Sequence, residues 1–186
     1  MHQLYALRML LVIAATEREA SPLRDVIGSR HRGSVFGVEA WDGRLGHVPV
    51  RLAVCGLGRA STTFHVARLL LDRPQAVLQF GVGGAFPEGP PVGGVALATE
   101  DTYADLGVAT EQRWLPADAL GIPLLERDGT CYYDTFPCAA EATAAAAKNL
   151  DAPTGRFVTV ETGTGTAARV HELAHRHRPL AESMEG

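Results

Sequence analysis

A continuous apolar run near the start of the chain, residues 9–15 (MLLVIAA), most restricts what this sequence can fold into. Apolar residues at consecutive positions, rather than at alternate ones, indicate a strand that is covered on both of its faces. The next segment, residues 16–27 (TEREASPLRDVI), has the pattern of an amphipathic helix with Thr16 as its N-cap. A buried strand that leads directly into a helix is typical of α/β folds.

The same arrangement, a strand that ends in a glycine-rich turn, occurs twice more along the chain. Shorter β patterns predict a hairpin or meander around Gly43 and Gly46, before a strand reaches the sequence CGLG at residues 55–58. A second buried strand over residues 76–80 ends in GVGGAF. Further strands are predicted over residues 95–99 and 156–160, and helices over residues 62–71, 139–150 and 166–176.

The length and the order of these elements predict one α/β domain over residues 1–186, with a mixed central sheet flanked by helices. No linker divides the chain. Residues 103–137 mix Pro, Gly, acidic and aromatic residues, which predicts a long excursion between core elements. Ligands of open α/β sheets bind at the carboxyl ends of the strands. We therefore expect the functional site where the glycine-rich turns follow the strands.

Charge and composition argue against several classes of function. The chain carries 17 basic and 21 acidic residues, a net charge of −4 with neutral histidine, which argues against binding to nucleic acid. The apolar run near the start is too short to cross a membrane, and it leads into a charged helix, unlike a secretory signal peptide. We therefore expect a cytoplasmic protein that does not bind membranes.

Neither a metal nor a cofactor is predicted. Cys55, Cys131 and Cys138 lack the spacing of metal ligands, and His171 and His175 do not form an HExxH pattern. A dinucleotide site requires GxGxxG at the opening of a helix, but the glycines at residues 81–85 are followed by FPEGPP, in which no helix can start. Each glycine cluster, taken alone, also fits a tight turn that packs strand against helix.

Two acidic positions become candidates for chemistry because of where they stand. Glu19 lies in the first turns of the first helix, where its carboxylate can face the carboxyl edge of the sheet. Glu185 follows Met184 near the end of the sequence. Taken singly, Glu19 fits an exposed helix face and Glu185 fits a frayed terminus.

The order of four motifs favours the functional interpretation. VIAATEREASPLRD, CGLGRA, FGVGGAF and AESMEG follow the order and approximate spacing of one family, and over essentially its whole length the sequence resembles the purine nucleoside phosphorylase and nucleosidase superfamily. The first motif is similar to the AMEEEVxxLRD stretch of methylthioadenosine/S-adenosylhomocysteine nucleosidases, and AESMEG is similar to their VEMEA segment. Val82 replaces a serine of those enzymes, and TVETGTG replaces a loop with a base-stacking Phe. With YADLGV at residues 103–108, these departures resemble the futalosine hydrolase branch.

The resemblance implies roles for individual residues. Glu19 would activate a water on the face of the ribose opposite the base, because cleavage passes through an oxocarbenium-like sugar. Glu185 would accept the 2′- and 3′-hydroxyls of the ribose, and Met184 would form an apolar wall for the sugar. The further substrate contacts that the resemblance implies are Ala15, Leu57, Val82, Gly83, Gly84, Val160 and Glu161.

The implied activity is hydrolysis of the N-glycosidic bond of a purine nucleoside, without a cofactor and in a homodimer. On this interpretation futalosine is converted to hypoxanthine and dehypoxanthine futalosine during menaquinone biosynthesis. Three alternatives stay open: a methylthioadenosine/S-adenosylhomocysteine nucleosidase, a purine nucleoside phosphorylase, in which Arg59 could face phosphate, and a non-catalytic nucleoside-binding subunit.

The resemblance also implies a helix and a strand that follow Gly186 in relatives, the strand carrying the acid that assists the departing purine. We therefore expect the fold of residues 1–186 to be C-terminally truncated. We also predict no general acid from these residues.

Overall fold

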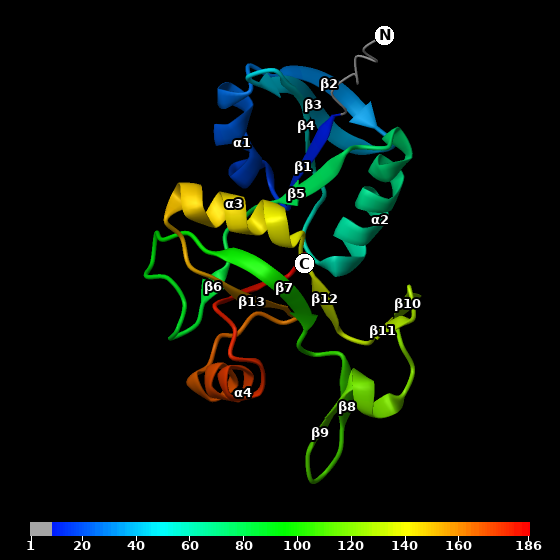
Figure 1. The fold of residues 1–186 in the computed structure, drawn as a ribbon, viewed down its shortest axis with the longest axis vertical. Helices are drawn as coiled ribbons and strands as arrows, with labels where there is room; N and C mark the ends of the chain where they lie inside the picture. The colour runs from blue at the N-terminus through cyan, green and yellow to red at the C-terminus, as the bar shows by residue number, and fades with distance from the viewer. Residues whose placement is uncertain (1–8) are drawn as a thin grey trace. The chain divides into compact units, whose positions relative to one another are not determined.

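The computed structural model describes residues 9–186 of the chain, which divide into two compact units. The first unit comprises residues up to Val82 together with Glu185, and the second comprises Gly83–Met184 together with Gly186. Each unit is built around its own five-stranded sheet (Figure 1). The predicted α/β class, with mixed sheets flanked by helices, is confirmed. A single domain over residues 1–186 stays a prediction.

The sheet of the first unit is mixed. Its strand order is β2 (Arg30–Val35), β3 (Val38–Leu45), β4 (Val48–Val54), β1 (Leu10–Ala14) and β5 (Ala76–Gln79), and the unit also contains α1 (Glu17–Val26), α2 (Arg59–Leu69) and the 3-10 turn η1 (Leu70–Asp72). β1 runs parallel to both of its neighbours, β4 and β5. The strands β2, β3 and β4 form an antiparallel meander. The three parallel strands therefore end at one edge of the sheet.

The central strand β1 is buried from both sides, as its continuous apolar sequence predicts. Its side chains alternate between two hydrophobic clusters: Leu11 belongs to the cluster that contains Leu69 of α2, and Val12 belongs to the cluster that contains Ala20 of α1. Figure 1 shows the two helices on opposite sides of this sheet. Alternation of this kind explains why consecutive positions of β1 are all apolar.

The predicted meander is present, and its two glycines have different roles. Gly46 lies in the β3–β4 turn with φ of +57°, which suits a glycine turn. Gly43, in contrast, lies inside β3. A Cβ atom on Gly43 would lie 2.5 Å from the carbonyl oxygen of Ile27, so glycine is required there by close packing and not by a turn.

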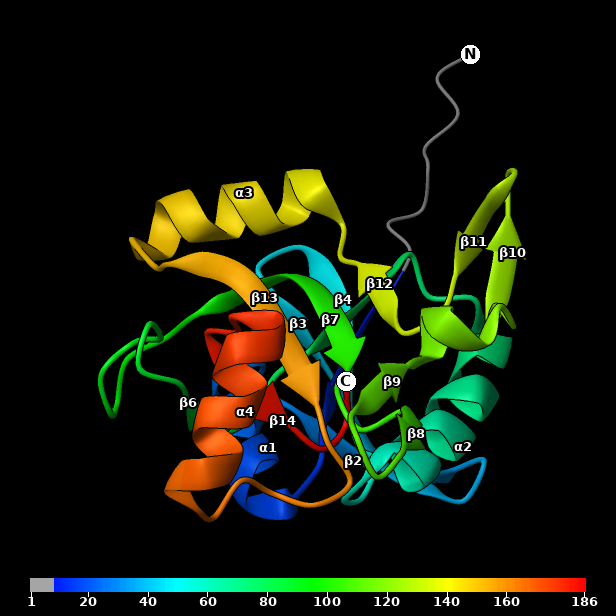
Figure 2. The same cartoon turned by 90° about the horizontal axis from the view of Figure 1, so that it is seen from below.

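The second unit has a mixed sheet of its own. Its strand order is β12 (Thr135–Pro137), β7 (Leu97–Tyr103), β13 (Thr154–Thr159), β14 (Ala181–Ser183) and β6 (Gly84–Ala85), with helices α3 (Ala140–Leu150) and α4 (Ala167–His177). β13 is parallel to β7 and β14, whereas the edge strands β12 and β6 pair antiparallel. Figure 2 shows α3 and α4 on opposite faces of this sheet. Leu173 of α4 packs with Val158 of β13 in the unit's hydrophobic cluster.

The predicted excursion over residues 103–137 contains short elements that have too few residues for a periodic signal. It holds two hairpins, β8 (Gly107–Ala109) with β9 (Trp114–Pro116) and β10 (Leu125–Arg127) with β11 (Thr130–Tyr132), and the 3-10 turn η2 (Ala117–Leu120). It ends in β12, whose three residues include Pro137. Such strands are stabilised by pairing with a neighbour, here β7, and not by their own sequence.

A buried arginine links strands β3 and β4 to the turn after α2. The side chain of Arg51 is only 8% exposed; its Nε donates to Asp42 at 2.8 Å, and its Nη1 donates to Asp72. Burial raises the pKa of Asp42, but the hydrogen bonds and charges of Arg51 and Arg32 outweigh burial and hold that pKa below its usual value of 3.8. A lowered pKa means that the folded state favours the ionised carboxylate.

We expect Arg51→Met to lower the free energy of unfolding by about 2 kcal/mol at neutral pH, because it leaves two carboxylates without their shared donor. Asp42 has a lowered pKa when folded, so its stabilisation is present above 3.8 and is lost as the pH falls through its folded value. The difference between variant and wild type should therefore shrink at about pH 3. Urea unfolding at both pH values measures it. Equal midpoints for Arg51→Met and for the exposed control Arg18→Met would contradict the prediction.

Candidate active site

Four predicted site residues of the first unit lie where its parallel strands end. Ala15 and Glu19 follow β1, Leu57 follows β4 and Val82 follows β5. Because β4 and β5 both run parallel to β1, these segments share the carboxyl edge of the sheet. The N–H of Gly56 donates to the carbonyl oxygen of Ala15 at 3.0 Å, which fixes the first glycine turn to the end of β1.

Both carboxylate oxygens of Glu19 accept hydrogen bonds. Its Oε2 accepts from the backbone N–H and the hydroxyl of Thr16, at 2.9 and 2.8 Å, while the Glu19 N–H donates to Thr16 Oγ1 at 3.3 Å. This reciprocal pair is a capping box, which stabilises the start of α1. Its Oε1 accepts from the N–H of Val82 at 2.9 Å. Glu19 is therefore partly buried and turned toward the end of β5.

The turn after β5 approaches this carboxylate with its backbone. A Cβ atom on Gly81 would lie 2.7 Å from Glu19 Oε1, so a side chain at that position would displace the carboxylate. Val82 contributes its N–H to Glu19, whereas its side chain is 86% exposed. The contact therefore depends on the backbone, which explains how valine can stand where the resembling nucleosidases have serine.

A second carboxylate of the first unit is held in a similar way. Oε1 of Glu185 accepts a hydrogen bond from the N–H of Gly58 at 3.1 Å. Gly58 has φ of +85° and is the N-cap of α2, where backbone N–H groups point out of the helix. The neighbouring side chain of Leu57 is 65% exposed. Glu19 and Glu185 thus each accept a backbone N–H from a glycine-containing turn.

The remaining predicted residues belong to the second unit. Val160 and Glu161 follow β13, Met184 follows β14, and Gly83 directly precedes Gly84 of β6. Val160 is fully buried in a hydrophobic cluster against which Met184 packs. The N–H of Val160 donates to Ser183 at 3.0 Å, which joins the ends of β13 and β14. Glu161 is exposed at the start of the following loop.

Two acidic residues that the sequence analysis did not single out hold this loop. Oδ2 of Asp105 accepts from the N–H of Glu161 at 2.6 Å. Oε1 of Glu182 accepts from the N–H of Thr164 at 2.8 Å, and Oε2 accepts from the Thr164 hydroxyl. Asp105 lies inside YADLGV and Glu182 inside AESMEG, but neither motif indicates which loop its acid holds.

Glycine at position 186 also has a steric reason. A Cβ atom there would lie 2.5 Å from Oδ2 of Asp101, a carboxylate that accepts a hydrogen bond from the Thr159 hydroxyl at 2.7 Å. Burial raises the pKa of Asp101 above its usual value. Asp101 and Thr159 therefore explain why ESMEG ends in glycine where the VEMEA segment ends in alanine.

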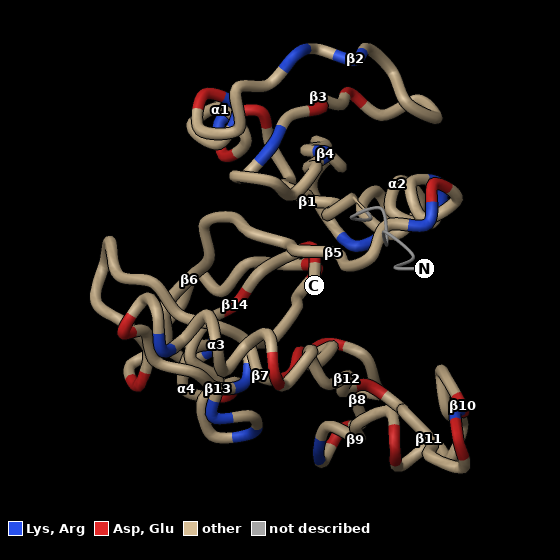
Figure 3. Tube along the Cα trace, turned by 45° about the horizontal axis from the view of Figure 1, so that its top comes forward, with Lys and Arg blue, Asp and Glu red and all other residues tan. Residues whose placement is uncertain are grey.

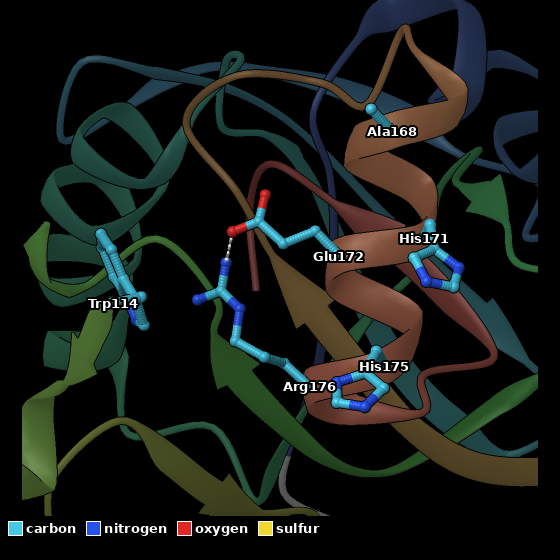
Figure 4. A pocket seen from close by; sticks show the side chains of 6 residues that line it. All are labelled: Trp114, Ala168, His171, Glu172, His175 and Arg176. Carbon is cyan, nitrogen blue, oxygen red and sulfur yellow. Dashed lines mark hydrogen bonds and ion pairs between the residues drawn. The ribbon is translucent and has the colours of Figure 1, made fainter. Parts of the chain in front are cut away.

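Two of the histidines of α4, His171 and His175, line a depression on the second unit, drawn in Figure 4. Glu172 and Arg176 point toward Trp114 and are joined by an ion pair, and the Arg176 guanidinium lies 5.0 Å from the centroid of the Trp114 ring. His171 and His175 lie one turn apart on the same helix. Among residues 9–186, no group of three His, Cys, Asp or Glu side chains is placed to hold a metal ion.

Charged residues of both signs occur along both units. Figure 3 shows Lys and Arg interspersed with Asp and Glu along the trace of each unit, in line with the near balance of 17 basic and 21 acidic residues. Within the part of the chain that the structure describes, no helix has the length and apolar character needed to cross a bilayer.

Comparison with known proteins gives consistent matches. The family model described as the phosphorylase superfamily matches residues 10–186. A futalosine hydrolase of Streptomyces coelicolor is 40% identical over 130 residues, which cover 68% of this chain and 52% of that protein. A futalosine hydrolase of Thermus thermophilus is 30% identical over 179 residues, which cover 96% of this chain and 73% of that protein.

A solved structure shows the same fold. The 5′-methylthioadenosine/S-adenosylhomocysteine nucleosidase of Neisseria meningitidis, in complex with methylthio-immucillin-A, superposes with a TM-score of 0.77 at 22% identity. The match covers 97% of this chain and 77% of that structure. The chain thus spans about half the length of the Streptomyces relative and about three quarters of the other two proteins.

We expect Thr16→Ala to lower the free energy of unfolding by about 1 kcal/mol, because it removes the hydroxyl that caps α1 and holds Glu19. Ser21→Ala is the matched control, since it removes a hydroxyl from the same helix with only a 3.4 Å bond to the Arg18 carbonyl. Urea unfolding of both variants measures the difference. Equal losses in the two variants would contradict a capping role for Thr16.

Proposed function

We propose that this chain, which belongs to the phosphorylase superfamily, is part of an enzyme that hydrolyses the N-glycosidic bond of a purine nucleoside. The family membership predicted from the order of the four motifs is confirmed. The reaction itself is our inference, because the family model is described by phosphorylases whereas the relatives are named as hydrolases and nucleosidases. It rests on the relatives and on the placement of Glu19.

We propose futalosine as the substrate, with hypoxanthine and dehypoxanthine futalosine as the products, in menaquinone biosynthesis. The two futalosine hydrolase relatives support this assignment. The departures at Val82 and in the TVETGTG loop support it as well, since they depart from the methylthioadenosine/S-adenosylhomocysteine nucleosidase pattern. We also propose a cytoplasmic homodimer, as in the family that the motifs resemble.

The observation that carries the proposal is the orientation of the Glu19 carboxylate. The capping box holds Oε2, while Oε1 faces the turn after β5 and accepts one hydrogen bond from Val82. A carboxylate oxygen has two lone pairs, so Oε1 retains the capacity to accept a proton from water. A positioned carboxylate of this kind can act as a general base.

In the proposed reaction Glu19 takes a proton from a water molecule, and the water oxygen forms a bond to the anomeric carbon of the ribose. The bond from that carbon to the purine nitrogen breaks, and its electron pair leaves with the base, which must gain a proton. The transition state resembles an oxocarbenium ion, which a nearby carboxylate stabilises. The acid that protonates the purine is not assigned to residues 1–186.

The sugar and the base are assigned to different segments. Glu185 would accept the ribose hydroxyls, since its two oxygens offer about four acceptor sites and Gly58 takes one of them. Met184 would supply the apolar wall of the sugar site. Gly83 and Gly84 would leave room beside the base, and the loop that begins at Glu161 would flank it. Ala15, Leu57 and Val160 complete the proposed contacts.

Phosphorolysis is the main rival reaction, and one observation favours it. Arg59 is the first residue of α2, directly after the positive-φ Gly58, and a helix N-terminus with an arginine can bind phosphate. A methylthioadenosine/S-adenosylhomocysteine nucleosidase is the rival substrate class, because solved structures of this fold include such enzymes. A non-catalytic nucleoside-binding subunit would bind the same ligands without turnover.

We expect the full-length protein to release hypoxanthine from futalosine in phosphate-free buffer, because Glu19 is placed to activate water and not phosphate. Chromatographic detection of free hypoxanthine measures the reaction, with and without added phosphate. Strict dependence on phosphate would establish a phosphorylase instead. Preferential cleavage of methylthioadenosine in a mixed assay would assign the protein to the neighbouring nucleosidase branch, and binding without turnover would identify a binding subunit.

We expect Glu19→Gln to lower kcat by about 100-fold to 10,000-fold, because the amide keeps the shape of the side chain but cannot accept the proton. KM should change much less. Glu17→Gln is the matched control, since Glu17 lies in the same turn of α1 with its carboxylate paired to Arg24. Both variants are assayed below their unfolding temperatures. Near-normal kcat in Glu19→Gln would leave Glu19 only its capping role.

A further inference from the structure

The loop after β13, residues 160–166, contains little that would order it by itself. We call it the clamped loop. It has no regular secondary structure, and most of its residues are exposed. A Cβ atom added to Gly163 or Gly165 would meet nothing within 4 Å, so both glycines stand in open space. Loops of this composition lose much conformational entropy when they are fixed.

Asp105 holds the start of the clamped loop. It lies just beyond the carboxyl end of β7, the strand that pairs parallel with β13. Its Oδ2 accepts the Glu161 N–H at 2.6 Å, and the neighbouring residue Ala104 donates its N–H to the carbonyl oxygen of Thr159 at 3.0 Å. The end of β7 therefore fixes the backbone direction in which the loop leaves β13.

Glu182 holds the middle of the clamped loop. Both of its carboxylate oxygens are used by one residue, since Oε1 accepts the Thr164 N–H at 2.8 Å and Oε2 accepts the Thr164 hydroxyl. Hydrogen bonds to an ionised carboxylate are about twice as strong as those between neutral groups. Two such bonds to one residue also fix its orientation.

Glu182 further links the clamped loop to the glycine turn. It is the register partner of Gly84 on β6 and of Val158 on β13. A Cβ atom on Gly84 would lie 3.0 Å from Glu182 Cγ and 3.2 Å from Oε1, so the glycine leaves the space that the carboxylate occupies. The Glu182 side chain thus contacts both segments that the proposed function assigns to the purine.

We propose that Asp105 and Glu182 are positioning residues for the purine base. They fix the backbone of the clamped loop before substrate arrives, so that its N–H and C=O groups meet the edge of the base without being ordered on binding. Preorganisation of this kind raises affinity by lowering the entropic cost of binding. The inference rests on the proposed function, because it assumes that the clamped loop flanks the base.

The test compares alanine and amide variants of both acids in the full-length protein. We expect Glu182→Ala and Asp105→Ala to raise KM for futalosine by about tenfold or more while kcat stays within about threefold, the signature of lost binding that is uniform in ground and transition states. Glu182→Gln and Asp105→Asn keep an oxygen that accepts the loop N–H, and should leave KM at the wild-type value. Affinity for free hypoxanthine, measured by calorimetry, should fall in parallel with the rise in KM.

Three further measurements separate positioning from general stability. Glu172→Ala removes a carboxylate of the same unit that pairs with Arg169 and Arg176 on α4, and it should leave KM and hypoxanthine affinity unchanged. Amide hydrogen exchange should accelerate at Glu161 in Asp105→Ala and at Thr164 in Glu182→Ala. Thr164→Val removes only the hydroxyl donor, and serves if an alanine variant does not fold. It should raise KM by about threefold.

The outcomes distinguish the inference from the proposed function. A lower kcat with unchanged KM and unchanged hypoxanthine affinity in the alanine variants would show a structural role alone and would overturn the inference. Unaltered hydrogen exchange at Glu161 and Thr164 would overturn it as well. A wild-type protein that neither binds hypoxanthine nor cleaves futalosine would overturn the proposed function, and the role of the clamped loop with it.

Discussion

Backbone N–H groups in the loops that follow parallel strands need acceptors, and in this protein carboxylates supply them. Glu19 accepts from Val82, Glu185 from Gly58, Asp105 from Glu161 and Glu182 from Thr164. Glycine-rich turns can approach a ligand closely because they lack side chains, but the same lack leaves them without packing of their own. The four acids therefore give order to turns that would otherwise be held only by the strands before them. Every proposed substrate contact lies in or next to an ordered segment. These hydrogen bonds hold some of the segments, and the ends of the strands hold the others.

The parts of this architecture that depend on local pattern could be predicted from the sequence. The apolar run at residues 9–15, the Thr16 cap and the glycine turns after strands all appear where expected, because burial on two faces, capping and turns leave signals within a few residues. The exceptions depend on contacts between distant residues. Gly43 is required by the Ile27 carbonyl, and the three-residue strands β12 and β14 exist through their partners. Asp105 and Glu182 were overlooked for the same reason, since no spacing indicates which loop an acid will hold.

Glu19 illustrates how one residue can satisfy two requirements. Its capping box stabilises the helix that follows β1, while the same bonds orient the carboxylate toward the end of β5. Substitution of Glu19 therefore changes both the start of α1 and the proposed chemistry. Thr16 contributes to both effects, because its hydroxyl caps α1 and also holds Oε2 of Glu19. A stable helix start and a correctly aimed base are, in this fold, consequences of one set of hydrogen bonds.

The exposed side chain of Val82 has a consequence for how relatives of this protein should be recognised. Its backbone N–H makes the contact with Glu19, so this contact does not depend on which side chain stands at position 82. Gly81 beside it, in contrast, cannot accept even a methyl group without displacing the carboxylate. The contacts of this turn therefore restrict the residue at position 81 more tightly than the residue at position 82. A search pattern that requires the glycine at position 81 and the acid at position 19, and accepts any residue at position 82, would recover divergent members. A pattern built on the serine would discard them.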